Sequence, residues 1–253
     1  MSGHEYLLGV LDGQKMGDAE VAALQRLRGE IEGVLRKTFG TVPRFYYGGS
    51  YGKHTMIRAS YDLDIVMYFP STDNRTLKQL YSGAYHVLKQ AGYTIQPKTV
   101  ALQLPYQGGF HVDVVPGKAQ DATYYWATLF KNTTPDSTMR TSIKKHIDTV
   151  SDNGCREIIK LMKLWRVRHG LQWKSIALEQ TVIGAMFQKQ RGDLGVAIWE
   201  NVLPFIRGNV LTVRLVDPAN SSNVFQMSRG ERVALLQAAT ESLKQKNWNQ
   251  VIW

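Results

Sequence analysis

Two aspartates stand at the head of a strongly apolar stretch, and this arrangement limits what the chain can fold into. Asp62 and Asp64 lead into Ile65–Phe69, which is too apolar for a solvated loop and favours a buried strand. Residues i and i+2 of a strand project from the same face, so the two carboxylates would lie side by side. Adjacent carboxylates repel each other unless a cation lies between them, and their oxygens suit Mg²⁺ or Mn²⁺. The pair therefore predicts a divalent metal site at the start of a β-strand.

A third acid and a glycine turn fit the same kind of site. Asp113 lies inside another apolar stretch, His111–Val115, and three acids on neighbouring strands can hold two metal ions that activate a hydroxyl. The turn Gly48-Gly49-Ser50 lets the backbone approach a phosphate and offers it amide N–H groups and a hydroxyl. Gly-Gly-Ser is a common turn and Asp-x-Asp is common on loops. The prediction of a nucleotidyl-transfer site therefore depends on finding all these features together.

The chain changes character near residue 140. Before this point, the pattern predicts helices over 18–40 and 74–90 and strands over 44–47, 63–69, 93–104 and 110–115. After it, helices are expected over 152–169, 175–190 and 193–205, and the capping box Ser228–Glu231 opens a last helix. We therefore expect an α+β fold with a mixed-sheet palm lobe in residues 1–140 and a helical lobe in residues 141–253. The active site is expected in a cleft between them.

Composition narrows the compartment and the partners. The 253 residues include 31 Lys and Arg against 21 Asp and Glu, a formal charge of +10, which suits polyanions such as nucleotides or RNA and equally a plain solvated basic surface. Cys155 is the single cysteine, so no internal disulfide forms. No signal-like start and no apolar run of about 18 residues is present, so we expect a cytoplasmic protein without a membrane partner.

The combined motifs resemble those of a known superfamily. Gly49-Ser50, Asp62-x-Asp64 and a later strand aspartate resemble the polymerase-beta-type nucleotidyltransferases. The fuller stretch Gly48–Thr55 resembles the branch of oligoadenylate synthetases and the bacterial CD-NTases related to cyclic GMP-AMP synthase. The helix segment Ile158–Trp165 and the later Val216–Asn220 resemble the same branch.

The resemblance implies a role for each matching residue. It implies that Asp62 and Asp64 bind both of two Mg²⁺ or Mn²⁺ ions, and that Asp113 binds the catalytic ion and is a base for the attacking hydroxyl. Gly49 and Ser50 would hold the triphosphate of ATP or GTP. In the helical lobe, Lys163 and Ser175 match positions that contact the outer phosphates of the triphosphate. In the palm lobe, Lys53 either binds substrate or neutralises the acids.

Two features have alternative interpretations. His111 shares the strand face of Asp113, where it either contacts substrate or makes a structural hydrogen bond. Arg156, Lys160 and Lys163 share a helix face at i, i+4 and i+7, which is either a basic stripe for phosphates or a solvated face.

Three functions remain open from the sequence. The preferred one is a metal-dependent nucleotidyltransferase that joins nucleotides into cyclic or linear oligonucleotide second messengers, in antiviral or antiphage defence, with RNA or another ligand as activator. The second transfers a nucleotide to an RNA 3′ end or a protein hydroxyl. The third is a basic nucleic-acid-binding module without chemistry, against which the presence of all three acids argues. The oligomeric state, base preference and linkage stay open.

Overall fold

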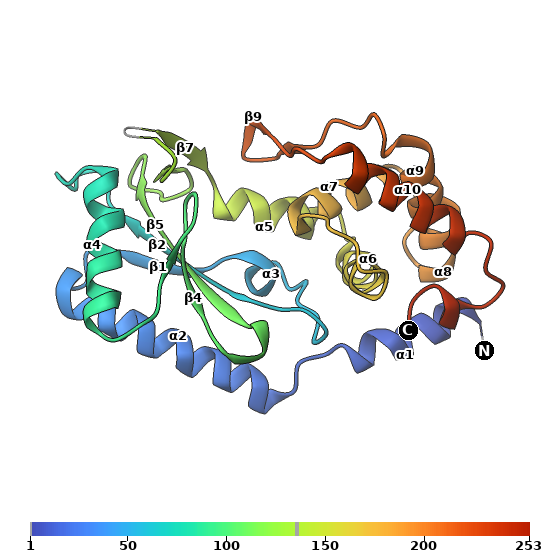
Figure 1. Ribbon diagram of the computed structural model, residues 1–253, viewed down its shortest axis with the longest axis horizontal. Helices are drawn as coiled ribbons and strands as arrows, with labels where there is room; N and C mark the ends of the chain where they lie inside the picture. The colour runs from blue at the N-terminus through green and yellow to red at the C-terminus, as the bar shows by residue number, and fades with distance from the viewer. Residues whose placement is uncertain (1, 135–136) are drawn as a thin grey trace. The chain divides into compact units, whose positions relative to one another are not determined.

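The computed structural model describes residues 2–134 and 137–253. The chain forms two compact units, whose elements are labelled in Figure 1. The sheet unit comprises Met16–His54 and Tyr61–Ile147, and the helical unit comprises Met1–Lys15, Thr55–Ser60 and Asp148–Trp253. The first fifteen residues and the short Thr55–Ser60 segment thus group with the C-terminal part, although both precede the predicted boundary near residue 140.

The sheet unit is built on a mixed seven-stranded sheet. Its main path has the order β1-β2-β5-β4-β3, and β6 and β7 extend it from β5. Strands β2 and β5 are parallel, whereas the other described pairs in this sheet are antiparallel. The strands are β1 Arg44–Tyr47, β2 Leu63–Phe69, β3 Gln96–Pro97, β4 Leu102–Pro105, β5 His111–Ala119, β6 Ala127–Phe130 and β7 Thr138–Thr141, and the helices are α2 Asp18–Phe39, α3 Gly49–Gly52, α4 Leu77–Gln90 and the turn η1 Gln107–Gly109.

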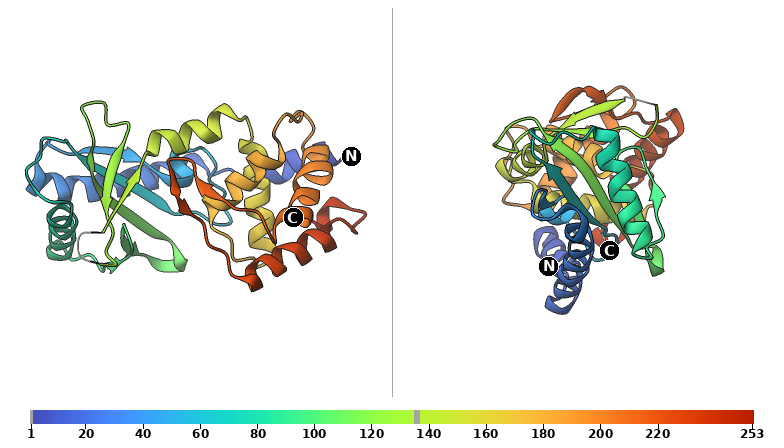
Figure 2. Two further views of the ribbon diagram at one scale, coloured as in Figure 1. Left: turned by 90° about the horizontal axis from the view of Figure 1, so that it is seen from above. Right: turned by 90° about the vertical axis from the view of Figure 1, so that its left-hand side faces the viewer.

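Side-chain alternation along β2 and β5 gives the sheet two different faces. Leu63, Ile65, Val112 and Val114 are fully buried in the core that also contains the apolar sides of α2 and α4. Figures 1 and 2 show α2 and α4 against the sheet. The residues between them in sequence, including Asp64, project from the opposite face. The large core on one side thus fixes the strands that carry the acids on the other.

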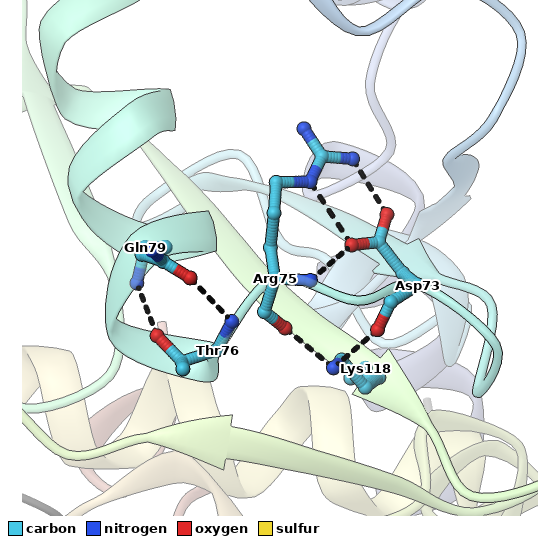
Figure 3. A network of polar contacts seen from close by, with 5 residues as sticks. All are labelled: Asp73, Arg75, Thr76, Gln79 and Lys118. Atoms are coloured by element: carbon cyan, nitrogen blue, oxygen red, sulfur yellow. Dashed lines mark hydrogen bonds and ion pairs between the residues drawn. The ribbon is translucent and has the colours of Figure 1, made fainter.

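A charged network holds the connection between β2 and α4 (Figure 3). The Asp73 carboxylate accepts hydrogen bonds from Arg75 Nε at 3.0 Å and Nη2 at 2.6 Å, which lowers the pKa of Asp73. Lys118 Nζ, on β5, donates to the carbonyl oxygens of Asp73 and Arg75. Thr76 and Gln79 then form the capping box that begins α4. The network ties the crossover between the two parallel strands to β5 itself.

The helical unit packs around a second, larger core. The tryptophan of the Ile158–Trp165 segment, Trp165, is fully buried, and its Nε1 donates to Ser242 Oγ at 2.9 Å. One continuous helical stretch from Leu194 to Asn209 contains a π-helical part at Ala197–Val202. The unit's elements are α1 Gly3–Gly13, α6 Arg156–Arg168, α7 Ser175–Ala185, α8 Leu194–Val196, η2 Ala197–Val202, α9 Leu203–Asn209, β8 Val216–Asp217, β9 Asn220–Val224, α10 Arg229–Ser242 and η3 Trp248–Gln250, while α5 Ile143–Asp152 runs from one unit into the other.

The predicted α+β class is confirmed, and most predicted elements are present with shifted ends. The long first helix is α2, although Gly17 and not Asp18 is its N-cap residue. The helix expected over 152–169 begins only at Arg156, after the separate helix α5. Across 2–134 and 137–253, no helix combines the length and apolar character needed to cross a membrane.

Candidate functional site

The sheet brings two of the three predicted acids into direct register. Asp64 on β2 pairs with Asp113 on the parallel neighbour β5. Paired residues of neighbouring strands project from the same face of a sheet, so the two carboxylates stand side by side. The flanking core residues on both strands hold this register, because a slip by one residue would move the acids into the core.

Asp62 lies just before β2, and the side chain of His111 lies near both Asp62 and Asp113. Its side chain is 41% exposed, and its Oδ2 lies 3.6 Å from His111 Nε2. The same imidazole nitrogen lies 3.9 Å from Asp113 Oδ2. His111 therefore lies beside two of the predicted metal ligands, on the strand face that its spacing from Asp113 predicted. Its two alternative roles, a substrate contact or a structural hydrogen bond, stay predictions.

Asp113 combines burial with an unsatisfied oxygen. Its side chain is 22% exposed, and its Oδ1 is buried without a hydrogen-bond partner. Burial raises the pKa of Asp113, and the charge of Asp62 adds to this, whereas His111, the hydrogen bond from Gln103 and Lys98 act in the opposite direction. Gln103 faces Asp113 across the β4–β5 pair. A buried carboxylate oxygen without a donor is suited to a cation.

The glycine turn is wedged against Asp64. Gly48 N–H donates to the Asp64 carbonyl oxygen at 2.9 Å, which joins the turn to β2. Gly49 has φ +48°, and a Cβ added there would lie 1.6 Å from Asp64 Oδ2. A Cβ on Gly52 would lie 2.5 Å from the Tyr47 carbonyl oxygen. Ser50 Oγ is buried without a hydrogen-bond partner. Only glycine therefore allows the turn to approach the acid so closely, and it leaves one hydroxyl available to a ligand.

The predicted phosphate-binding cations are buried. Lys53 is 7% exposed and Lys163 is 3% exposed. Within the helical unit, Lys163 Nζ donates to Thr55 Oγ1 at 2.8 Å and to its carbonyl oxygen, and lies 3.1 Å from Glu179 Oε1. Of the two interpretations of the face of Arg156, Lys160 and Lys163, the solvated face is therefore wrong for Lys163, and the phosphate-binding stripe stays a prediction. Its partner Glu179 lies on the next helix, α7, and the burial of this ion pair was not predicted.

Ser175 is the first residue of α7, and its hydroxyl already has a partner. Its Oγ accepts a hydrogen bond from Arg166 Nη1 at 3.1 Å, and the same nitrogen donates to the Trp173 carbonyl oxygen at 2.6 Å. Arg166 thus holds the turn between α6 and α7.

The fit of these residues to a divalent metal is partial. Among residues 2–134 and 137–253, no group of three or more His, Cys, Asp and Glu side chains is arranged to hold a metal ion. The registered pair Asp64 and Asp113, with the unsatisfied Asp113 Oδ1, does suit a hard cation. The expected convergence of all three carboxylates is not seen, because Asp62 is turned toward His111.

Comparison with known proteins finds similarity in the fold and not in the sequence. No family model matches the sequence, and no curated protein matches it either. Among solved structures, CdnC of E. coli MS115-1 with ATP aligns with a TM-score of 0.71 at 18% identity, over 94% of this chain and 89% of that one.

Two further structures align over almost the whole chain. The CdnE cyclic dinucleotide synthase of Elizabethkingia meningoseptica, with GTP and Apcpp, gives a TM-score of 0.71 at 15% identity and covers 100% of both chains. The CD-NTase CdnG of Bradyrhizobium diazoefficiens, with GTP, gives 0.72 at 12% identity over 96% of this chain and 91% of that one. The fold that the resemblance implied is confirmed, because the chain has the bilobal α+β fold of CdnC, CdnE and the CD-NTase CdnG.

Proposed function

We propose that the protein is a metal-dependent nucleotidyltransferase that joins nucleoside triphosphates into cyclic or linear oligonucleotide second messengers. The observation that carries this proposal is the registered pair Asp64 and Asp113, placed against the Gly48–Ser50 turn, with one buried Asp113 oxygen unsatisfied. Three solved structures that share the fold contain ATP or GTP, which supports nucleotides as substrates. A role in antiviral or antiphage defence follows from the motif resemblance.

In this reaction, the three acids and the glycine turn of the sheet unit have separate tasks. Asp64 and Asp113, with Asp62 beside them, would hold the metal ions. When bound, Mg²⁺ supplies charge that stabilises the attacking and leaving oxygens of an in-line displacement at the α-phosphate. Asp113, whose pKa is raised by burial, accepts the proton of the attacking hydroxyl. The unsatisfied Ser50 hydroxyl and the backbone N–H groups of the glycine turn orient the triphosphate.

Lys163 and Ser175 stay predicted phosphate contacts. Since Lys163 Nζ is bonded to Thr55 and close to Glu179, it would have to exchange one of these partners for a phosphate oxygen. Ser175 would likewise have to share its hydroxyl with Arg166.

The direct test is pyrophosphate release with each of the four nucleoside triphosphates, alone and in pairs, with Mg²⁺ or Mn²⁺. We expect release and a phosphatase-resistant product whose mass identifies it. Asp64→Asn and Asp113→Asn should lose at least about 1,000-fold in rate, because a metal ligand and the base are removed. Asp18→Asn, at an exposed position on α2, is the matched control and should keep the wild-type rate. No release with any pair, or equal rates in the acid variants, would contradict the proposal.

The second acceptor class is tested in the same assay. The formal charge of +10 favours RNA as an acceptor, because phosphate contacts dominate nucleic-acid affinity. If a labelled nucleotide migrates with added RNA or with protein, and no small oligonucleotide forms, the transfer chemistry stands and the acceptor is an RNA end or a protein hydroxyl. Release that depends on RNA but leaves it unlabelled would identify RNA as an activator.

A further inference from the structure

The helical unit contains a pocket that none of the catalytic residues above lines. The pocket measures about 300 Å³, within the range of ligand-binding cavities. Its walls come from three segments far apart in sequence, namely the start of α1, the stretch from α8 into the π-helical η2, and the residues after α10. Figure 1 shows α1, α8 and the C-terminal residues close to one another within this unit. The side chains used below are Asp193, Trp199, Glu200, Lys246, Asn247 and Trp248.

Two glycines allow these segments to approach closely. A Cβ on Gly3 would lie 2.2 Å from Trp248 Nε1, so the indole rests directly on the backbone of α1. A Cβ on Gly195 would lie 3.1 Å from Asp193 Oδ1 and 3.5 Å from the Gly3 carbonyl carbon. The Leu194 N–H also donates to His4 Nδ1 at 3.2 Å, which joins α8 to α1. The floor of the pocket is therefore fixed by backbone contacts.

Besides the pocket itself, the π-helical segment is a second, independent observation that indicates a binding site here. Ala197–Val202 interrupts an otherwise α-helical stretch and contains both Trp199 and Glu200. Such segments are rare, and they occur frequently at functional sites. The Trp199 and Trp248 rings meet edge to face, with centroids 5.4 Å apart. The non-α-helical turn thus carries the aromatic and the acidic side chain that line the pocket.

The polar groups of the pocket are available to a ligand. Asp193 Oδ1 already accepts from the Val196 N–H, whereas Glu200 and Lys246 are exposed and make no side-chain hydrogen bond or ion pair with any described residue. The lining therefore offers planar aromatic rings, a free carboxylate and a free ammonium. In a chain of formal charge +10, two carboxylates in one pocket also disfavour a highly charged polyphosphate.

We propose that this pocket binds a purine nucleoside monophosphate, with guanine preferred. A purine ring stacks on an indole, and such stacking tolerates any base but is strongest for large ring systems. Guanine presents N–H donors at ring atom N1 and at the neighbouring exocyclic amino group, which a carboxylate such as Glu200 accepts together. The Lys246 ammonium pairs with the single phosphate, and Asn247 offers an amide. The site is separate from the proposed transfer reaction, because GMP has no pyrophosphate leaving group.

Calorimetric titration of the full chain with GMP tests the site. We expect one bound GMP per chain, weakened about tenfold or more in Glu200→Gln and in Lys246→Ala. Glu241→Gln and Lys244→Ala are matched controls, because these two residues form an exposed ion pair that does not line the pocket. Both controls should bind within twofold of wild type. Guanosine should bind wild type more weakly than GMP does. Guanosine and GMP should bind Lys246→Ala with equal affinity, because the partner of the phosphate is removed.

Further outcomes separate this site from the catalytic one. GMP should bind Asp64→Asn/Asp113→Asn as it binds wild type, and CMP should bind more weakly than GMP. Absence of GMP binding at millimolar concentration would overturn the proposal and leave the transfer function untouched. GMP binding that is unchanged in Glu200→Gln and Lys246→Ala would also overturn the proposal. GMP binding that is lost in Asp64→Asn/Asp113→Asn would do the same. Tighter binding of choline than of GMP would show a cation cage instead and would also overturn it.

Discussion

Gly49 has no room for a side chain. Its φ of +48° disfavours other residues, and a Cβ would collide with Asp64 Oδ2. The glycine turn and the Asp64 carboxylate are therefore adjusted to each other at the level of single atoms. A substitution that displaces either one displaces both.

We predict that Gly49→Ala lowers the rate of pyrophosphate release by about 100-fold or more, because a shift of about 1 Å in a reacting group has this effect. Steady-state kinetics at saturating nucleotide and metal measure it. Gly33→Ala is the control, since a Cβ at this mid-helix position meets nothing within 4 Å. It should keep full activity and gain about 0.5–1 kcal/mol of stability. Equal activity of the two variants would show that the contact with Asp64 is not needed.

We predict that Gln103 acts on the proposed catalysis through Asp113. Its hydrogen bond lowers the pKa of Asp113 and so favours the ionised form that a metal needs. Gln103→Leu should therefore raise the pKa of Asp113 further and move the acidic limb of the pH–rate profile to higher pH. It should also weaken Mn²⁺ binding by about 10- to 100-fold.

The pH profile and calorimetric Mn²⁺ titration separate this role from a structural one. Gln103→Glu should shift the limb in the same direction, because a second carboxylate disfavours ionisation of Asp113. Gln90→Leu, at an exposed position on α4, should leave the profile unchanged. If Gln103→Leu lowers the rate equally at every pH, the proposed action on Asp113 is wrong.

At the scale of elements, the buried ion pair Lys163–Glu179 joins α6 and α7 to the segment that begins at Thr55. Both side chains are almost fully buried. Removing one partner leaves an uncompensated charge, whereas replacing both with apolar groups of similar volume is often neutral.

We predict that Lys163→Met lowers the free energy of unfolding by about 3–5 kcal/mol. Lys163→Met/Glu179→Leu should recover most of this loss, and Lys174→Met, at an exposed position, should change stability by less than about 0.5 kcal/mol. Urea denaturation measures all three. A double variant no more stable than Lys163→Met would show that hydrogen bonds to Thr55, and not the charge pair, hold the helices.

The elements were predictable where periodicity was strong. Helices α2 and α10 and strand β2 follow from apolar spacing and caps alone. Strands β6 and β7 were missed because each has only four residues, and β7 contains a single apolar residue, Met139. Helix α1 was missed because glycines weaken its pattern, although Ser2 and Glu5 form a capping box.

The site was predictable only in part, because some of its residues carry local sequence signals and others act through contacts that exist only in the folded chain. The acids and the glycine turn carry local signals, so their residues could be named. Gln103 carries no pattern of its own, and the motif Gly48–Thr55 does not indicate that Thr55 accepts a hydrogen bond from Lys163, 108 residues away. The turn of Asp62 toward His111 depends on the relative position of two strand ends, which spacing does not encode.

For the whole molecule, the proposed metal site implies that metal and proton compete for Asp113. Because its folded-state pKa is raised, the metal-free protein has the full contribution of this group below the unfolded pKa of about 3.9 and loses it as pH rises through the folded value. Near neutral pH, a bound cation should restore the loss. A metal at 100 times its dissociation constant stabilises a protein by about 2.7 kcal/mol.

We therefore predict that EDTA abolishes pyrophosphate release and that Mg²⁺ or Mn²⁺ restores it. In the absence of nucleotide, Mn²⁺ should raise the Tm of wild type at pH 7 and leave that of Asp113→Asn unchanged. Without metal, Asp113→Asn should be the more stable of the two at pH 7, and this advantage should vanish near pH 4. Full activity in EDTA, or equal Mn²⁺ shifts in both proteins, would contradict this.

Parallel pairing of β2 and β5 has a consequence for how the gene can change. The two carboxylates meet through strand register alone, while the chain between them makes a long crossover through α4, β3 and β4. Lengthening that crossover at the exposed Gly92 would leave their spacing intact, whereas a single residue inserted into either strand would destroy it. The lineage can thus acquire new surface loops in this region, and an experimenter can place an epitope tag there, without touching the chemistry.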